Sequence, residues 1–220
     1  MLPDLPQTEI AIIDMTNAFR KEQKLGEVKP NAALTAAARA FAQYLASTGR
    51  FAHEADGRAP HQRAEAAGYR YCFVAENLAM NLDSRGFETK QLARQAMDGW
   101  KASPGHRENL LQPVVTEIGV GVARATDRNP KFISVQLVGR PVELRIKFVI
   151  LNQTMAALSY AFGKGTHTLP PRTSVTYTSC EAGELRFDKA GGTVRETPRD
   201  GDRFVVRGPA GSPKVSLERK

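Results

Sequence analysis

The spacing of apolar residues changes partway along the chain, and this change decides which fold classes are open to it. Up to about residue 115, apolar side chains recur every three or four residues, as in Leu34, Ala38, Phe41 and Leu45, which predicts amphipathic helices. After that point apolar and polar residues alternate, as in residues 116–122, which predicts half-buried strands. The sequence therefore predicts an α+β protein that is mainly helical at first and ends in strands.

The last third of the chain shows almost only strand signals. Residues 142–150 alternate cleanly, and short strand candidates follow near 155–162, 174–179, 184–187, 203–207 and 214–218, separated by turns rich in glycine and proline. Residues 155–162 are also compatible with a short helix. Several short strands of this kind are typical of a small β-sandwich or barrel. We therefore predict two domains, residues 1–140 and residues 141–220.

The net charge is +8, and most of the excess lies late in the chain, where residues 140–220 hold 14 Lys and Arg against 8 Asp and Glu. Such an excess attracts anionic surfaces. No Lys/Arg run or aromatic-interleaved basic motif is present, so no specific nucleic acid is expected as a partner. No apolar run approaches the roughly 20 residues of a transmembrane helix. Residues 1–6 do not read as the start of an intact signal peptide, so we expect that any export leader has been removed.

The two cysteines, Cys72 and Cys180, fall in different predicted domains. Two cysteines exclude a disulfide-dense scaffold and a zinc site made of four thiolates. Cys72 lies in a predicted strand, which favours a buried structural thiol over a reactive one. A disulfide formed in an oxidising compartment is the alternative.

Two of the four histidines stand in distinctive settings. His53 lies in a turn-rich stretch after the second predicted helix, and His106 lies in the first turn of a helix for which Ser103 is the predicted N-cap. The positive end of the helix dipole disfavours imidazolium there and predicts a neutral His106 ring. Capping would occupy the Ser103 hydroxyl, so we do not expect a serine nucleophile. His61 and His167 are predicted to be surface residues.

Two carboxylates interrupt apolar segments. Glu76 lies within Val74–Ala79, and burying a carboxylate costs several kcal/mol unless it is paired. We therefore expect a partner for Glu76, either a histidine or a metal ion. Glu117 begins a strand face that is otherwise glycine, which leaves room for a neighbouring backbone or a ligand.

Four segments together resemble the CAP superfamily, also called the SCP domain, which contains cysteine-rich secretory, antigen 5 and pathogenesis-related proteins. The match is to the bacterial branch and spans about residues 8–139. Its segments are Phe51-Ala52-His53 followed by Asp56-Gly57, Ala75-Glu76-Asn77-Leu78-Ala79, Trp-x-x-Ser-Pro-Gly-His-Arg-x-Asn-Leu-Leu over residues 100–111, and Thr-Glu-Ile-Gly-Val-Gly-Val-Ala over residues 116–123. The resemblance implies a CAP-type α-β-α sandwich, followed here by the small all-β domain.

The resemblance also implies a cleft with two histidines and two acidic residues. His53 and His106 match the histidine pair, and Glu76 matches the first acid. Glutamate closely follows the tryptophan in the eukaryotic branch but is missing after Trp100, so Glu117 is the candidate for the second acid. The set suits a divalent metal such as zinc, bound by His53 and His106 with Glu76 or Glu117 and completed by water. Metal binding varies in the family, so a polar cleft without metal is the alternative.

For function, the resemblance implies an extracellular or periplasmic bacterial protein that acts as a binding module rather than a fast enzyme. Its partners would be a metal or small ligand in the cleft, a lipid or sterol, or an anionic cell-surface component. The main alternative is a metal-dependent hydrolase of peptide or ester bonds, and a third is a purely structural protein. The sequence gives no indication of the oligomeric state.

Overall fold

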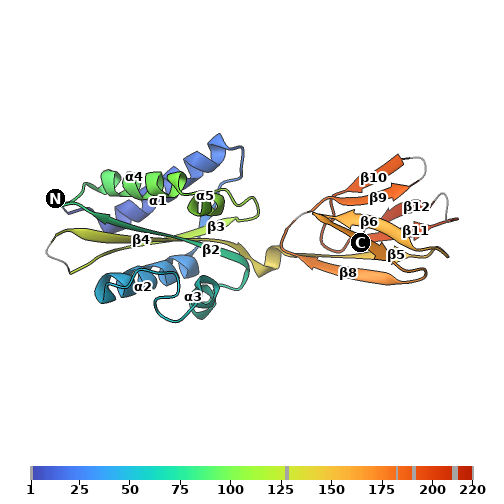
Figure 1. Cartoon of the computed structure of the whole chain (residues 1–220), viewed down its shortest axis with the longest axis horizontal. Coiled ribbons are helices and arrows are strands. Elements are labelled where there is room, and N and C mark those ends of the chain that lie inside the picture. Colours follow the sequence, from blue (N-terminus) through green and yellow to red (C-terminus); the bar gives the residue numbers. More distant parts are fainter. Residues whose placement is uncertain (1, 127–128, 182, 190–191, 210–212, 220) are drawn as a thin grey trace. The chain divides into compact units, whose positions relative to one another are not determined.

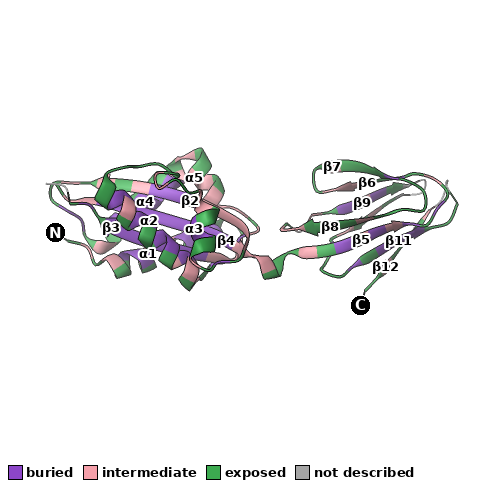
Figure 2. Ribbon diagram, turned by 90° about the horizontal axis from the view of Figure 1, so that it is seen from below, coloured by how far each residue is buried: buried purple, intermediate pink, exposed green. Residues whose placement is uncertain are grey.

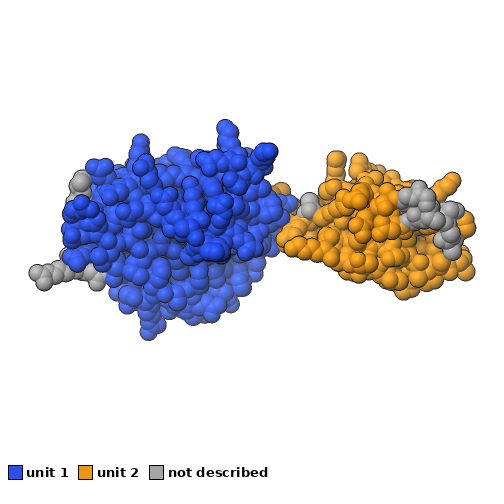
Figure 3. All heavy atoms as spheres, turned by 45° about the horizontal axis from the view of Figure 1, so that its top comes forward, with its two compact units in different colours: residues 1–142 blue, residues 143–220 orange. Residues whose placement is uncertain are grey.

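The computed structural model describes residues 2–126, 129–181, 183–189, 192–209 and 213–219. The chain forms two compact units, Met1–Val142 and Glu143–Lys220, which are coloured separately in Figure 3. Among the described residues, no helix has the length and apolar character needed to cross a membrane.

The first unit is built on one sheet with the strand order β1-β3-β4-β2. Its strands are β1 (Lys29–Pro30), β2 (Tyr71–Leu82), β3 (Glu117–Arg124) and β4 (Lys131–Pro141). Strand β1 runs parallel to β3, and the other neighbours are antiparallel. Strand β2 is an edge strand, and it is longer than the short segment around Glu76 that the sequence predicts.

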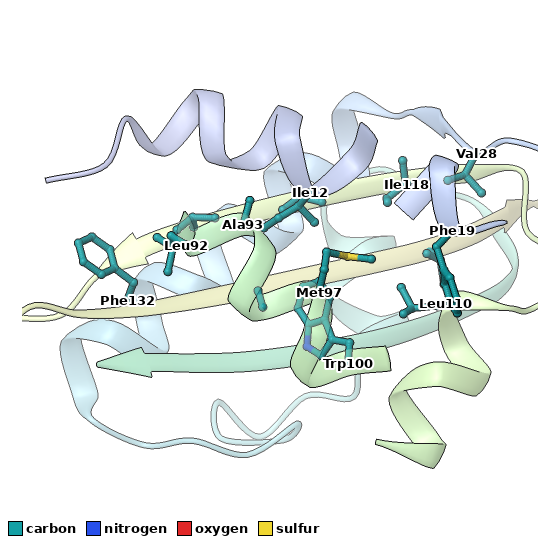
Figure 4. Packing of buried hydrophobic residues seen from close by; sticks show 14 of the residues in the cluster. Ile12, Phe19, Val28, Leu92, Ala93, Met97, Trp100, Leu110, Ile118 and Phe132 are labelled. Carbon is teal, nitrogen blue, oxygen red and sulfur yellow. The ribbon is translucent and has the colours of Figure 1, made fainter. Parts of the chain in front are cut away.

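Helices cover both faces of this sheet (Figures 1 and 2). Helices α1 (Leu5–Glu22), α4 (Thr89–Ala102) and α5 (Pro104–Leu110) lie on one face, and α2 (Ala32–Thr48) and α3 (Pro60–Ala66) lie on the other. Figure 4 shows part of the core on the first face, a cluster that includes Ile12 and Phe19 of α1 and Met97 and Trp100 of α4. The predicted α-β-α sandwich is confirmed.

Helix α2 lies unusually close to the sheet. Asn31 caps its first turn by accepting hydrogen bonds from the amides of residues 33 and 34. A Cβ atom added to Gly119 would come 2.2 Å from the carbonyl carbon of Leu34, and one added to Gly121 would come 2.3 Å from the backbone nitrogen of Arg39. The space that these glycines leave on the face of β3 is thus filled by the backbone of α2.

The second unit is all-β, as predicted. Its two sheets have the orders β10-β9-β6-β7 and β12-β11-β5-β8, and Phe148, Tyr160, Phe187 and Phe204 from both sheets share one core. The strands are β5 (Ile146–Asn152), β6 (Leu158–Phe162), β7 (Gly165–Leu169), β8 (Ser174–Ser179), β9 (Leu185–Lys189), β10 (Gly192–Glu196), β11 (Arg203–Arg207) and β12 (Lys214–Glu218).

Three local predictions need correction in this unit. Residues 142–144 form a 3-10 turn, and the strand predicted from residue 142 begins at Ile146. Residues 158–162 form a strand, so the short-helix alternative is wrong. His167 lies on strand β7 rather than in a loop, although it is exposed as predicted.

The described residues contain no free cysteine, and Cys72 and Cys180 are both disulfide-bonded. The favoured prediction of a buried free thiol at Cys72 is therefore wrong. The alternative prediction, that the cysteines form a disulfide, agrees with the structure.

Candidate functional site

Three of the four predicted site residues belong to elements that meet at the edge strand β2. Glu76 lies on β2, His53 lies in the segment between α2 and α3, and His106 lies in the first turn of α5. Helices α3 and α5 both pack against β2. Because these helices cover opposite faces of the sheet, the two histidines approach the edge strand from its two sides.

The carboxylate of Glu76 is buried and fully engaged, with the residue only 4% exposed. Its Oε1 lies 2.8 Å from His53 Nδ1, and its Oε2 accepts a hydrogen bond of 2.8 Å from Arg63 Nη2. Burial therefore comes with two partners, a histidine and a cation, which is the arrangement that makes a buried carboxylate tolerable.

Arg63, which the sequence analysis did not single out, is the centre of this cluster. Its guanidinium is almost completely buried and donates to the carboxylates of Asp56 and Glu76, both at 2.8 Å, and to the carbonyl of His53 at 2.9 Å. The same group lies 3.5 Å from the centre of the Phe41 ring. The burial of Glu76 signals a need for a cation, but nothing in the sequence distinguishes Arg63 from its neighbouring arginines as that cation.

The two imidazoles have opposite protonation preferences. The hydrogen bond to Glu76 raises the pKa of His53 above its ordinary value, although burial and the charge of Arg63 act against this. Burial, together with the charge of His53, lowers the pKa of His106. The prediction that His106 favours the neutral form thus has the right direction, and burial is the largest cause of the lowered pKa. Ser103 takes the N-cap position without a side-chain capping bond, so the prediction that capping occupies its hydroxyl is wrong.

Side-chain amides join α5 to the edge strand. Asn109 Nδ2 donates to the carbonyl of Glu76 and to Asn77 Oδ1, both at 3.0 Å, and Asn77 Nδ2 donates to the carbonyl of His106 at 3.2 Å. Both asparagines lie in the CAP-like motifs, but the sequence does not predict a role for them. Their role is to fix the turn that carries His106 against the strand that carries Glu76.

Glu117 has a different environment from the other three. Tyr69 donates its hydroxyl to Glu117 Oε2 at 2.7 Å, and Asn31 Nδ2 donates to Oε1 at 3.2 Å. Strand β4 separates β3, which carries Glu117, from β2. None of the described contacts joins Glu117 to His53, Glu76 or His106, so its membership of the cleft stays a prediction.

A closed metal centre is not formed by the side chains that the structure describes. Within the described residues, no group of three or more His, Cys, Asp or Glu is placed to hold a metal ion. Since Glu76 contacts Nδ1 of His53, the Nε2 atom of this half-exposed ring is left for a ligand. Imidazole nitrogens suit zinc and similar transition ions, and a carboxylate that holds the other ring nitrogen orients such a ligand.

The fold, with paired histidines at its edge strand, defines the class of protein. An α-β-α sandwich with this arrangement is a CAP domain, and the model of the cysteine-rich secretory protein family (CAP) matches residues 13–138. The chain therefore belongs to the CAP family.

Three of the proteins to which the chain is similar come from bacteria. The chain is 31% identical over 114 residues to the uncharacterized protein YkwD of Bacillus subtilis, a match that covers 51% of this chain but only 41% of YkwD. Among solved structures it resembles an outer surface protein of Borrelia burgdorferi (TM-score 0.51, 22% identity, 59% of this chain and 90% of that one). It also resembles an extracellular SCP-domain protein of Bacillus anthracis (TM-score 0.51, 22% identity, 62% and 41%). These two likenesses concern the fold.

Proposed function

We propose that this chain is an exported bacterial binding module whose His53–His106 pair takes one divalent transition ion such as zinc. The observation that carries the proposal is the contact between His53 Nδ1 and Glu76, which leaves Nε2 of His53 available for a ligand. The charge of His53 lowers the pKa of His106, so the two rings are within electrostatic reach of each other. His53 and His106 would be the protein ligands, and water or a small anionic ligand would complete the coordination. A bound ion would supply a Lewis-acidic position for that ligand.

Export is supported by two independent observations. Both cysteines are disulfide-bonded, a state that oxidising compartments permit and the cytosol usually does not. Two similar structures are named as an outer surface protein and an extracellular protein.

An anionic cell-surface component is the partner we propose for the second unit. Lys147, Arg203, Arg207 and Lys214 are exposed, and the strand register places them on one face of the sheet β12-β11-β5-β8, opposite to its core face. Glu218 pairs with both arginines. Four basic residues against this one carboxylate leave the face with a positive excess, which would attract a polyanion.

The geometry favours binding over hydrolysis. A metal-dependent hydrolase uses a group near the metal to accept a proton from the attacking water. The carboxylate of Glu76 cannot serve in this way without losing a contact, because one oxygen faces His53 and the other faces Arg63. The hydrolase is accordingly the second candidate, to be judged by the same experiment.

The test is a calorimetric titration of the chelator-treated full chain with Zn²⁺ near neutral pH. We expect about one ion per chain, lost in His53→Ala and in His106→Ala. His167→Ala is the matched control, because His167 is exposed on strand β7 of the second unit. Zinc binding that survives both cleft substitutions would refute the proposal. Zinc-dependent ester or peptide hydrolysis that is lost in His106→Ala would replace it with the hydrolase.

A further inference from the structure

A cavity of about 550 Å³ lies between helices α2 and α3, apart from the histidine pair. Its volume is within the range of small-molecule sites. Much of its wall consists of methyl groups, from Ala36 and Ala40 on α2 and from Ala66 and Ala67 on α3, together with Tyr44. The short side chains on both helices leave the space open.

A buried cation with an unused donor lines this cavity. Arg63 belongs to the cavity wall, and its side chain is 5% exposed. Both of its terminal nitrogens are hydrogen-bonded, but Nε has no hydrogen-bond partner in the described part of the chain. A buried donor without an acceptor costs free energy, so this wall of the cavity carries a cation whose hydrogen-bonding capacity is not fully used.

A second cation stands at the same wall. The backbone of Arg58 is held in place, because its amide donates to Asp56 Oδ1 and its carbonyl accepts from Arg63 Nη1. Its guanidinium is exposed and takes part in none of the described hydrogen bonds or ion pairs. The carboxylate of Asp56, which also lines the cavity, is paired with Arg63 at 2.8 Å. The charge left for a ligand is therefore the positive charge of Arg58.

We propose that this cavity binds a compact aromatic carboxylate. The ligand carboxylate would pair with Arg58, in the planar geometry that guanidinium groups favour. The ring system would lie against the alanine methyl groups and Tyr44. The site goes beyond the proposed function, since it is on the α2–α3 side and uses neither imidazole.

The experiment uses 1-naphthoate as the probe, titrated into the full chain by calorimetry. We expect binding of about one molecule per chain. Arg58→Gln should weaken the affinity at least about tenfold, which corresponds to about 1.4 kcal/mol. Arg94→Gln removes the same charge from an exposed position on α4 and should leave the affinity unchanged.

Ala40→Phe tests the cavity itself, because Ala40 is an exposed residue of the cavity wall and the larger side chain would fill the space. It should abolish binding of 1-naphthoate, whereas Ala32→Phe, exposed on the same helix outside the wall, should not. Circular dichroism and an unchanged Zn²⁺ titration would show that the fold and the histidine pair persist. The zinc proposal and this one can therefore fail separately.

Three results would overturn the inference. The first is no binding of 1-naphthoate, or binding that neither Arg58→Gln nor Ala40→Phe reduces. The second is equal affinity for the neutral analogue 1-naphthylmethanol, which would remove the role of the carboxylate. The third is that palmitate displaces 1-naphthoate and that Ala40→Phe does not change the binding of either molecule. The chain would then bind an alkyl ligand at a site outside this cavity.

Discussion

At the scale of single residues, Arg63 decides whether Glu76 can be buried as a carboxylate. Each terminal nitrogen of Arg63 meets a different carboxylate, and its removal would leave Glu76 with His53 alone. Removing one member of a buried ion pair costs about 3–5 kcal/mol. We expect Arg63→Met to lower the free energy of unfolding by about 3 kcal/mol, near the low end of that range because His53 still contacts Glu76.

Urea unfolding of the purified chain measures this loss. Arg94→Met is the control, since Arg94 is exposed and should change the free energy of unfolding by no more than about 0.5 kcal/mol. Similar small losses in both variants would mean that the guanidinium is not what stabilises Glu76.

The two histidines make a prediction about pH. Ring-proton NMR titration should give a midpoint for His53 above the ordinary value of about 6.5 and a midpoint for His106 below it. Glu76→Gln should lower the pKa of His53, because the hydrogen bond to Glu76 is the main cause of its rise. His53→Gln should raise the pKa of His106, since the charge of His53 is one cause of its depression. A His106 midpoint indifferent to His53→Gln would show that the two rings do not interact.

The same shifts give opposite contributions to stability. A raised folded-state pKa means that the contribution of His53 is fully present below about pH 6.5 and is lost as the pH rises through its folded-state value. His106 behaves in the reverse way, because its lowered pKa makes folding less favourable as the pH falls below about 6.5. The check is the urea midpoint of unfolding measured across this pH window. His53→Gln should reduce the fall of the midpoint at high pH, and His106→Gln should reduce its fall at low pH.

At the scale of secondary-structure elements, the contact of α2 with β3 depends on two glycines. The atoms that a Cβ at Gly119 would meet first, at 2.2 and 2.3 Å, are backbone atoms of α2, which cannot move aside as a side chain could. Gly119→Ala should therefore destabilise the chain by about 1–3 kcal/mol, as overpacking does. Gly99→Ala is the matched control, because Gly99 lies within helix α4 with nothing within 4 Å of the added carbon.

Thermal or urea unfolding of the two alanine variants distinguishes these effects. Gly99→Ala should stabilise the chain by up to about 1 kcal/mol, through the higher helix propensity of alanine. An unchanged free energy of unfolding in Gly119→Ala would mean that α2 can move away from the sheet without a loss of stability.

Periodicity was sufficient to predict most elements, and its failures have physical reasons. Periodicity does not predict strands β7 and β10, and it assigns the segment before Ile146 to the strand although that segment forms a turn. Alternation marks a half-buried strand, but it does not show where hydrogen bonding to a neighbour begins. His53, Glu76 and His106 could be found because they lie in distinctive local motifs. Arg63 could not, because its role arises only when α3 packs against β2.

Glu117 shows the limit of a carried-over motif. The sequence predicts its position on the strand and the room on its glycine-rich face, which the backbone of α2 fills. The sequence could not show that Tyr69 and Asn31 would bind both carboxylate oxygens. A strand position fixes the face of a side chain, whereas its partners depend on which helix covers that face.

At the scale of the whole molecule, the two units have separate cores. The first unit has one buried cluster on each face of its sheet, and the cluster around Phe148 and Phe204 is confined to the second. The CAP family model ends at residue 138, close to the division that follows Val142. The histidine pair and the α2–α3 cavity both belong to the first unit.

The basic face of the second unit gives the prediction that belongs to this scale. At low ionic strength the full chain should bind vesicles that contain phosphatidylglycerol, and added salt should release it because exposed charges are screened. Lys147→Gln combined with Lys214→Gln should weaken binding by about 2 kcal/mol, at about 1 kcal/mol for each basic residue near an anionic surface. Lys90→Gln with Arg94→Gln removes the same charge from exposed positions on α4. Equal losses in the two double variants, measured by vesicle sedimentation, would show that net charge rather than this face governs binding.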